Sequence, residues 1–331
     1  MSAHGAVLPS FATAAGRGNR AVRRAAVCAA VVATALAAPA VASAHPRTTT
    51  VAIDYRLTLG PTAAGVQARI LDGDRDLRLT VAQGTRVVVL GDLGEPMLRF
   101  APGGVWVNLA SPTAQANKLI VDPGKGWKLL RTGRTFAWHE HRLGPPPYQA
   151  GVYGPVARWS VPVEVDGRRS AIGGSFIRVP RPLVPAWLFG VAIFVALGWS
   201  ALKLRPRIGS SLTIAAGAVA GLGALFAETA FTLRDSTTGK VTWVPIAVAA
   251  AVVAIAGALL VSGRVAPRAY VAGAIGAGVG ALTLSWFGVF LHGHVVAAAP
   301  GGPVRFACAA ALACGLLALV GSLSLRTEDV R

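Results

Sequence analysis

The sequence predicts a membrane protein in two parts: an all-β domain over residues 45–181, followed by a bundle of five transmembrane helices. Three observations predict this fold class. The chain is 53% hydrophobic and only 14% charged, whereas soluble domains carry about 25% charged residues, and its mean hydropathy is +0.56. Its first part alternates short β-branched runs with turn residues. Its second part contains long apolar segments separated by short polar loops.

Residues 1–44 predict a cleaved signal peptide. Arginines come first, an apolar run follows, and the segment closes with Ala-Ser-Ala at Ala44. A basic region, an apolar core and a small-residue cleavage site in this order are typical of secretory leaders. Cleavage after Ala44 makes His45 the new amino terminus, and cleavage after Ala40 is the alternative. The sequence leaves the secretion route open.

The β domain is expected to be an immunoglobulin-like sandwich of about eight strands, because short strands at even spacing with turn signals between them favour that architecture. The domain contains no cysteine, so its core forms without disulfide bonds. Asp72, Asp74 and Asp76 lack the glycine spacing of a calcium loop and are interpreted as a solvated hairpin turn. The expected strands cover residues 49–59, 66–71, 77–81, 86–90, 105–109, 135–139, 158–165 and 175–179.

The apolar segments are each close to the ~20 residues that cross the ~30 Å hydrocarbon layer. A cleaved leader places the β domain outside the cell, so the loops after the first, third and fifth spans are cytoplasmic. Lys203, Arg264 and the tail 326–331 carry the basic residues expected there. The sequence thus predicts a multi-pass cell-membrane protein with its carboxyl terminus inside and the lipid bilayer as its partner. The expected spans are about 184–202, 208–231, 243–263, 269–291 and 304–325.

Glycines four residues apart in the second and fourth spans, such as Gly217 and Gly276, predict close helix packing. Packing within one chain is the simpler interpretation, and a homo-oligomer is the alternative.

The histidines supply the candidate metal ligands. Apart from His4 in the leader, every histidine falls on the predicted outer side of the membrane. His139 and His141 are two residues apart, so in extended backbone both point to one face and could hold one metal ion. Neutral imidazole is a common ligand of copper and zinc. His45, as a free amino terminus, would add an α-amine to its imidazole.

Three further residues are weaker candidates for metal binding. His292 and His294 flank a glycine beyond the fourth span, and they could share an ion if the helix ends there. Glu228 lies at membrane depth, where an acidic group is a functional candidate by default. Its expected partners are His292, His294 or Arg234.

Three motifs carry a resemblance to a known family: 94–100 (GEPMLRF), 104–108 (GVWVN) with Ser-Pro at 111–112, and 138–142 (WHEHR). Together they resemble an uncharacterised family of actinobacterial membrane proteins with a signal peptide, a β-rich outer domain and a helical membrane region. The resemblance covers most of 45–325 and implies that architecture without an activity.

The chain is also similar, more weakly, to CopC-type copper-binding domains joined to a CopD-like membrane part. Such domains begin with a histidine, as His45 does after cleavage, and end in an Asp-Gly-His segment. Here Asp166 and Gly167 are followed by Arg168, and Pro46 follows His45. The family's own copper site is therefore incomplete, and a metal site in this chain would have to recruit His139 and His141.

No nucleophile elbow, phosphate-binding loop or dinucleotide fingerprint occurs, so we expect that the protein is not an enzyme. Its basic residues are spread over all regions, which does not favour nucleic acid. The first hypothesis is metal binding, with copper favoured. The alternative is an interaction or scaffold protein of the cell envelope that uses 95–100, 138–142 and the tryptophans of the β domain. A small transporter is the third hypothesis and is ranked last, because five spans do not divide into two equal halves.

Overall fold

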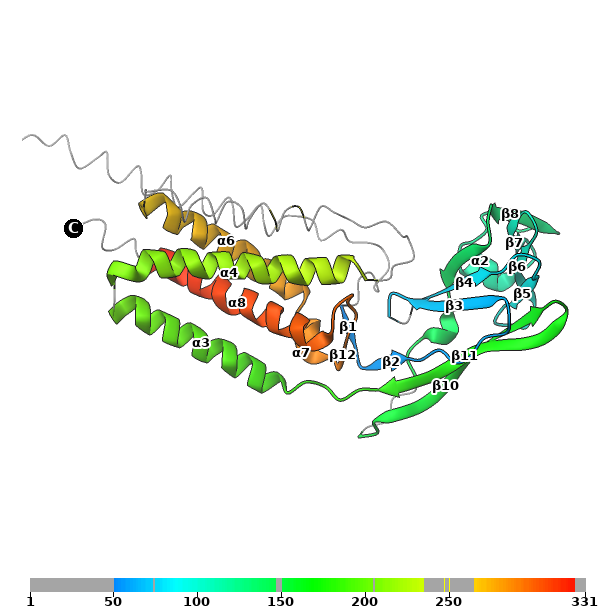
Figure 1. Ribbon diagram of the computed structural model, residues 1–331, viewed down its shortest axis with the longest axis horizontal. Coiled ribbons are helices and arrows are strands. Elements are labelled where there is room, and N and C mark those ends of the chain that lie inside the picture. Colours follow the sequence, from blue (N-terminus) through cyan, green and yellow to red (C-terminus); the bar gives the residue numbers. More distant parts are fainter. Residues whose placement is uncertain are drawn as a thin grey trace, which may run out of the picture.

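The molecule has an elongated helical part and a β-rich part that lie end to end (Figure 1). They meet where β1 (Ala52–Ile53) pairs with β12 (His294–Val295) in a two-stranded antiparallel sheet. The computed structural model describes residues 51–73, 75–146, 151–204, 206–234, 247, 250 and 265–324. The expected signal peptide, His45 and nearly all of the expected span 243–263 lie outside these residues.

The β domain contains two antiparallel sheets. The larger has the strand order β2-β11-β10-β5-β6-β7-β8, and the smaller has the order β3-β4-β9. The strands of the larger sheet are β2 (Tyr55–Leu57), β5 (Val87–Leu90), β6 (Pro96–Ala101), β7 (Gly104–Asn108), β8 (Trp127–Arg131), β10 (Gly154–Val165) and β11 (Arg168–Arg178). Those of the smaller sheet are β3 (Val66–Leu71), β4 (Asp76–Val81) and β9 (Thr135–His139).

Both sheets contribute alternate side chains to one apolar core, which is how a sandwich forms. Leu77 and Leu79 of β4 and Val87 and Val89 of β5 are fully buried in it. On each strand, the residue between the two buried side chains is only half-buried. The prediction of a β-rich domain is therefore confirmed, and its core forms without a disulfide bond.

The prediction located most strands of the β domain but missed two of them. β3 and β9 have the predicted bounds, and the strand predicted at 49–59 is divided into β1 and β2. β6 begins with a proline, and β8 reads Trp-Lys-Leu-Leu-Arg without a β-branched residue. Neither strand shows the composition on which the prediction relied. β8 lies at the edge of its sheet and pairs with only one neighbouring strand, β7.

The helical part contains apolar helices long enough to cross a bilayer. Among the described residues, Val184–Leu204, Ser211–Thr232 and Gly301–Leu323 meet this criterion of length and composition. These spans correspond to the first, second and fifth predicted segments, and the fourth is also helical. The helices are α3 (Val184–Leu204), α4 (Pro206–Thr232), α6 (Val265–Ser285), α7 (Gly288–Leu291) and α8 (Gly301–Ser324).

Small residues allow the helices to pack closely within the chain. A methyl group added at Gly217 of α4 would lie 3.4 Å from Ala272 of α6, and one at Gly276 of α6 would collide with the backbone of α8 at Gly315. These two glycines serve packing within one chain. Phe189 and Phe194 on the outer side of α3 stay exposed, and apolar side chains in that position suit a lipid environment.

Candidate functional site

The rings of His139 and His141 touch each other at the end of β9. Their centroids are 4.9 Å apart and their planes stand edge to face at 82°. His139 is the last residue of β9, and His141 begins a short 3-10 helix, η2 (His141–Leu143). Glu140 between them keeps an extended backbone. The predicted i, i+2 relationship therefore holds, and it brings the two imidazoles together.

The residues between and beside the histidines form a rigid frame. Glu140 is 2% exposed and accepts a 3.0 Å hydrogen bond from the indole of Trp138. The Arg142 guanidinium donates to both oxygens of Glu140, at 2.6 and 2.8 Å, and to the carbonyl of Leu90 at 3.1 Å. Hydrogen bonds among Trp138, Glu140 and Arg142 thus hold this segment in place. The side chains of His139 and His141 stay about half exposed.

A carboxylate lies next to each of the two imidazoles. His139 Nδ1 is 3.4 Å from Asp76 Oδ1, and His141 Nδ1 is 3.3 Å from Asp92 Oδ2. The Asp76 carboxylate raises the pKa of His139 above its ordinary value, although partial burial opposes the shift. A carboxylate facing Nδ1 favours a proton on that nitrogen, which leaves the lone pair of Nε2 available.

This arrangement resembles the outer shell of a metal-binding histidine, in which a carboxylate orients the ring and increases its basicity. Within the parts of the chain that the structure describes, no group of three or more histidine, cysteine, aspartate or glutamate side chains could hold a metal ion. The pair by itself would therefore supply only two nitrogen ligands to an ion. Water, another solute or a residue outside the described ranges, such as His45, would have to complete the coordination.

The second His-x-His segment lies at the junction of the two parts of the molecule and has different partners. His292 Nδ1 is 3.2 Å from Asp54 Oδ1. The same aspartate receives hydrogen bonds from the Arg181 guanidinium, at 2.6 and 3.0 Å, and from the Gly293 amide at 3.2 Å. Burial alone would raise the pKa of Asp54, but the bonds from Arg181, Gly293 and His292 lower it below its ordinary value.

His294 is positioned by backbone pairing rather than by a carboxylate. It lies opposite Ile53 in the β1–β12 sheet. Burial lowers the pKa of His294, and the charges of Arg56 and Arg305 lower it further. Arg305 also donates hydrogen bonds to the carbonyls of Val289, His292 and Gly293, at 2.6 to 2.8 Å. The structure therefore uses His292 and His294 to join the two parts.

Two acidic groups have partners that the sequence did not indicate. Glu228 accepts a 3.1 Å hydrogen bond from the indole of Trp286, and not from the expected His292, His294 or Arg234. Arg234 instead lies 3.3 Å from Asp72 in the β3–β4 turn. This turn also packs through Gly73 against Val296. The interpretation of the turn as solvated is therefore wrong, because the turn rests on the end of the helical part.

The proposed recognition motifs are mostly internal. Met97, Leu98 and Phe100 of β6 are at most 1% exposed, and Trp138 and Trp159 belong to the core. Glu95 accepts a 2.7 Å hydrogen bond from Ser111, which caps α2 (Pro112–Ala116). The first two motifs of the resemblance thus bind each other and stabilise the domain.

One aromatic and basic patch does lie on the outer face of the larger sheet. The Arg99 guanidinium lies 4.5 Å from the ring centre of Trp127 and 5.6 Å from that of Trp106. Both indoles are half-buried.

Comparisons with protein-family models, with curated proteins and with solved structures found no match for this chain.

The sequence did not single out Asp54, Asp76 or Asp92 as partners of histidines. The partners of Asp54 lie 127 and 239 residues along the chain. Asp92 lies 49 residues from His141. Only the strand pairing β4–β9 places Asp76 opposite His139. A correct pairing of these two strands would have been the only available signal.

Proposed function

We propose that this chain is a multi-pass cell-membrane protein whose outer β domain binds a transition-metal ion, copper above others, through Nε2 of His139 and His141. The orientation rests on the predicted cleaved leader and on the basic loops after the first, third and fifth spans. The domain would then be an immunoglobulin-like sandwich on the outer face, and the carboxyl terminus would be cytoplasmic. The weak resemblance to CopC-type domains agrees with this proposal.

A single observation carries the proposal: two accessible imidazoles touch each other, and each has its own carboxylate at Nδ1. The two imidazoles are 41% and 46% exposed, so an ion in solution can reach both of them. Among divalent first-row metals, Cu(II) binds most tightly to a given set of nitrogen and oxygen ligands, so it is the favoured ion. The proposal includes no catalytic step.

Calorimetric titration of Cu(II) and Zn(II) into the full-length protein in a neutral detergent tests this function. Purification should avoid a histidine tag. We expect Cu(II) to bind more tightly than Zn(II), and the double variant His139→Ala/His141→Ala to lose at least about 100-fold in affinity, since both protein ligands are gone. His292→Ala is the matched control and should keep the affinity. Millimolar binding to the native chain, or equal binding to the double variant, would refute the proposal.

The second candidate function is docking of an envelope protein, and the patch of Arg99, Trp106 and Trp127 favours it. Tryptophan and arginine dominate the energetics of protein interfaces, and here they lie together on an outer sheet face. Crosslinking from position 127 in whole membranes should capture one defined partner or a second copy of the chain. Loss of that product in Arg99→Gln would support docking. Its persistence there would count against this patch.

Transport has the least support. Glu228 is hydrogen-bonded to Trp286, which is sufficient to explain an acidic group at that depth.

A further inference from the structure

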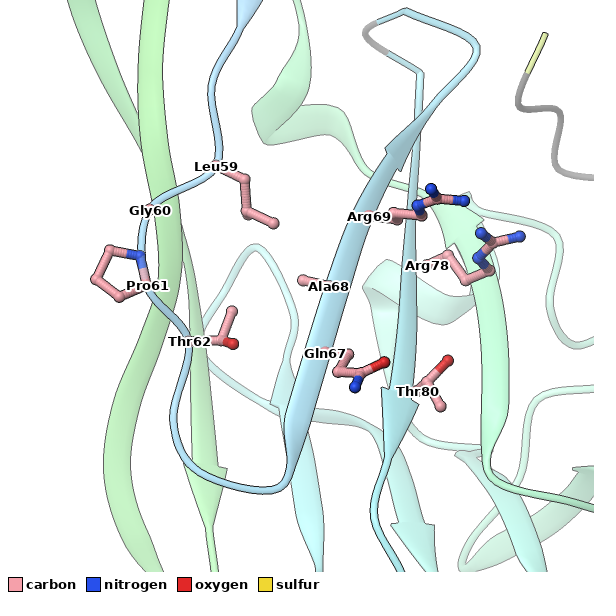
Figure 2. Close-up of a pocket in the computed structure, with 9 residues that line it drawn as sticks. All are labelled: Leu59, Gly60, Pro61, Thr62, Gln67, Ala68, Arg69, Arg78 and Thr80. Carbon is pink, nitrogen blue, oxygen red and sulfur yellow. The ribbon is translucent and has the colours of Figure 1, made fainter.

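A hollow of about 570 Å³ lies over the outer face of the small sheet. Figure 2 shows the loop of Leu59 to Thr62 on one side of strand β3, and Arg69 and Arg78 next to each other on β3 and β4. Leu59 and Pro61 supply an apolar wall. The polar lining consists of Thr62, Gln67, Arg69, Arg78 and Thr80.

The two arginines are paired directly across the strands, since Arg69 is the register partner of Arg78. Like charges in directly opposed positions destabilise a sheet. Arg78 is half-buried, and it makes no ion pair with any residue that the structure describes. An anion placed between the two guanidinium groups would give Arg78 a partner of opposite charge.

The chemistry of the lining indicates which anion fits. Guanidinium groups bind phosphate through paired hydrogen bonds, and two of them suit a group with several charged oxygens. The amide of Gln67 adds a donor at the same face, beside the hydroxyl of Thr80, which is hydrogen-bonded to that of Thr135 at 2.9 Å. The hollow is larger than a phosphate ion, so the phosphate could carry a further chemical group against Leu59 and Pro61.

The hollow also lies close to the level where lipid headgroups are found. Asp72 contacts Arg234, just beyond the end of the apolar helix α4 at Thr232. Arg69 precedes Asp72 by three residues of strand, or about 10 Å. Polar headgroups extend roughly 5–7 Å beyond the hydrocarbon on each side, and an arginine side chain can bridge the remaining distance.

We propose that this hollow binds a phosphate group, either free in solution or as part of a lipid headgroup. Neither arginine belongs to the proposed metal site, and the binding of phosphate does not depend on a metal ion.

The test uses the full-length protein in a neutral detergent and metal-free buffer, with two probes. In the first arm, inorganic phosphate is titrated and its binding is followed by calorimetry. In the second, micelles contain phosphatidylglycerol or phosphatidylcholine, and bound lipid is counted by native mass spectrometry. Arg78→Gln should weaken binding about tenfold, the effect of losing one charge-assisted hydrogen-bonding group. Arg158→Gln, the same change at an exposed arginine of β10, should leave it within twofold.

The arms distinguish the two sources of phosphate. An effect of Arg78→Gln on phosphate titration alone identifies a soluble ligand. An effect on retained phosphatidylglycerol, with phosphatidylcholine unaffected, identifies a lipid. Arg69→Gln should reproduce either result, and Arg78→Lys should restore part of the binding, which keeps the test valid if Arg78→Gln misfolds. If neither probe distinguishes the Arg78 and Arg69 variants from Arg158→Gln, the proposal is wrong.

Discussion

The chain contains two His-x-His segments that look alike in sequence and serve different purposes in the structure. His139 and His141 touch each other, and each has its own carboxylate. His292 instead contacts Asp54, and His294 is paired with Ile53. The first segment leaves its imidazoles available, whereas the second uses them to connect the two parts of the molecule.

The charges around the two pairs differ. Asp76 and Asp92 face the first pair, and Asp92 also lies 3.5 Å from the Arg142 guanidinium. At the second pair, Arg181 forms an ion pair with Asp54, and Arg56 and Arg305 act on His294. Under the proposed function, these charges would favour a cation more at the first pair than at the second. The motif alone does not decide the function, since the neighbours that fold against it set its charge.

The largest expected effect is a loss of folding stability when an acidic residue that holds one of the two His-x-His segments in place is replaced. Glu140→Ala removes the buried carboxylate that pairs with Arg142 and accepts a hydrogen bond from the Trp138 indole, and it leaves Arg142 the longer ion pair with Asp92, at 3.5 Å. Loss of one member of a buried pair costs about 3 kcal/mol. Asp54→Ala should cost only about 1 kcal/mol, because Arg181 is largely exposed and its ion pair is screened. Urea unfolding of the full-length protein, followed by tryptophan fluorescence, measures both. If Asp54→Ala lowered the free energy of unfolding more than Glu140→Ala does, this prediction would be wrong.

The next effect concerns the carboxylates that orient the first pair. We expect Asp76→Asn and Asp92→Asn each to weaken Cu(II) binding about tenfold, as outer-shell substitutions do at metal-binding histidines. Asp54→Asn removes the same charge at the second pair and should leave the affinity unchanged. Calorimetric titration of the three variants measures this. Equal losses in all three would mean that general electrostatics, and not ring orientation, governs binding.

The smallest effect is a difference in titration between the two pairs. Asp76 raises the pKa of His139 above 6.5, whereas burial and nearby arginines lower that of His294 below 6.5. His139 therefore stabilises the fold fully below pH 6.5 and loses this contribution as pH rises through its raised pKa. His294 favours the fold above pH 6.5 and loses that contribution as pH falls through its lowered pKa. Imidazole NMR resonances should show His139 titrating at higher pH than His294, and the opposite order would disprove the assignment.

The sequence predicted features that depend on local pattern. Apolar length located the helices, alternation located most strands, and the two-residue spacing of His139 and His141 predicted that they share a face. The bounds of β3 were predictable because β-branched and apolar residues alternate there between two turns. β8 was not, because an edge strand with exposed side chains lacks that signal.

Side-chain partners that are far apart in the sequence could not be predicted from it. Asp54, Asp76 and Asp92 are ordinary surface-type residues in sequence, and only the fold brings each of them to a histidine. Glu228 was recognised as unusual, but its partner Trp286 lies 58 residues further along. An indole was not among the expected partners, since charge suggested an ion pair and the structure instead has a hydrogen bond from the N–H of Trp286.

The β1–β12 pairing determines when the molecule can be completed during synthesis. Gly293, which binds Asp54, leaves the ribosome 239 residues after it. The two sheets of the β domain can form long before then, but β1 must wait for β12, which precedes α8. The pairing of β1 with β12 is therefore a late event, and a chain that ends before residue 294 would contain the β domain without this strand connection to the helical part.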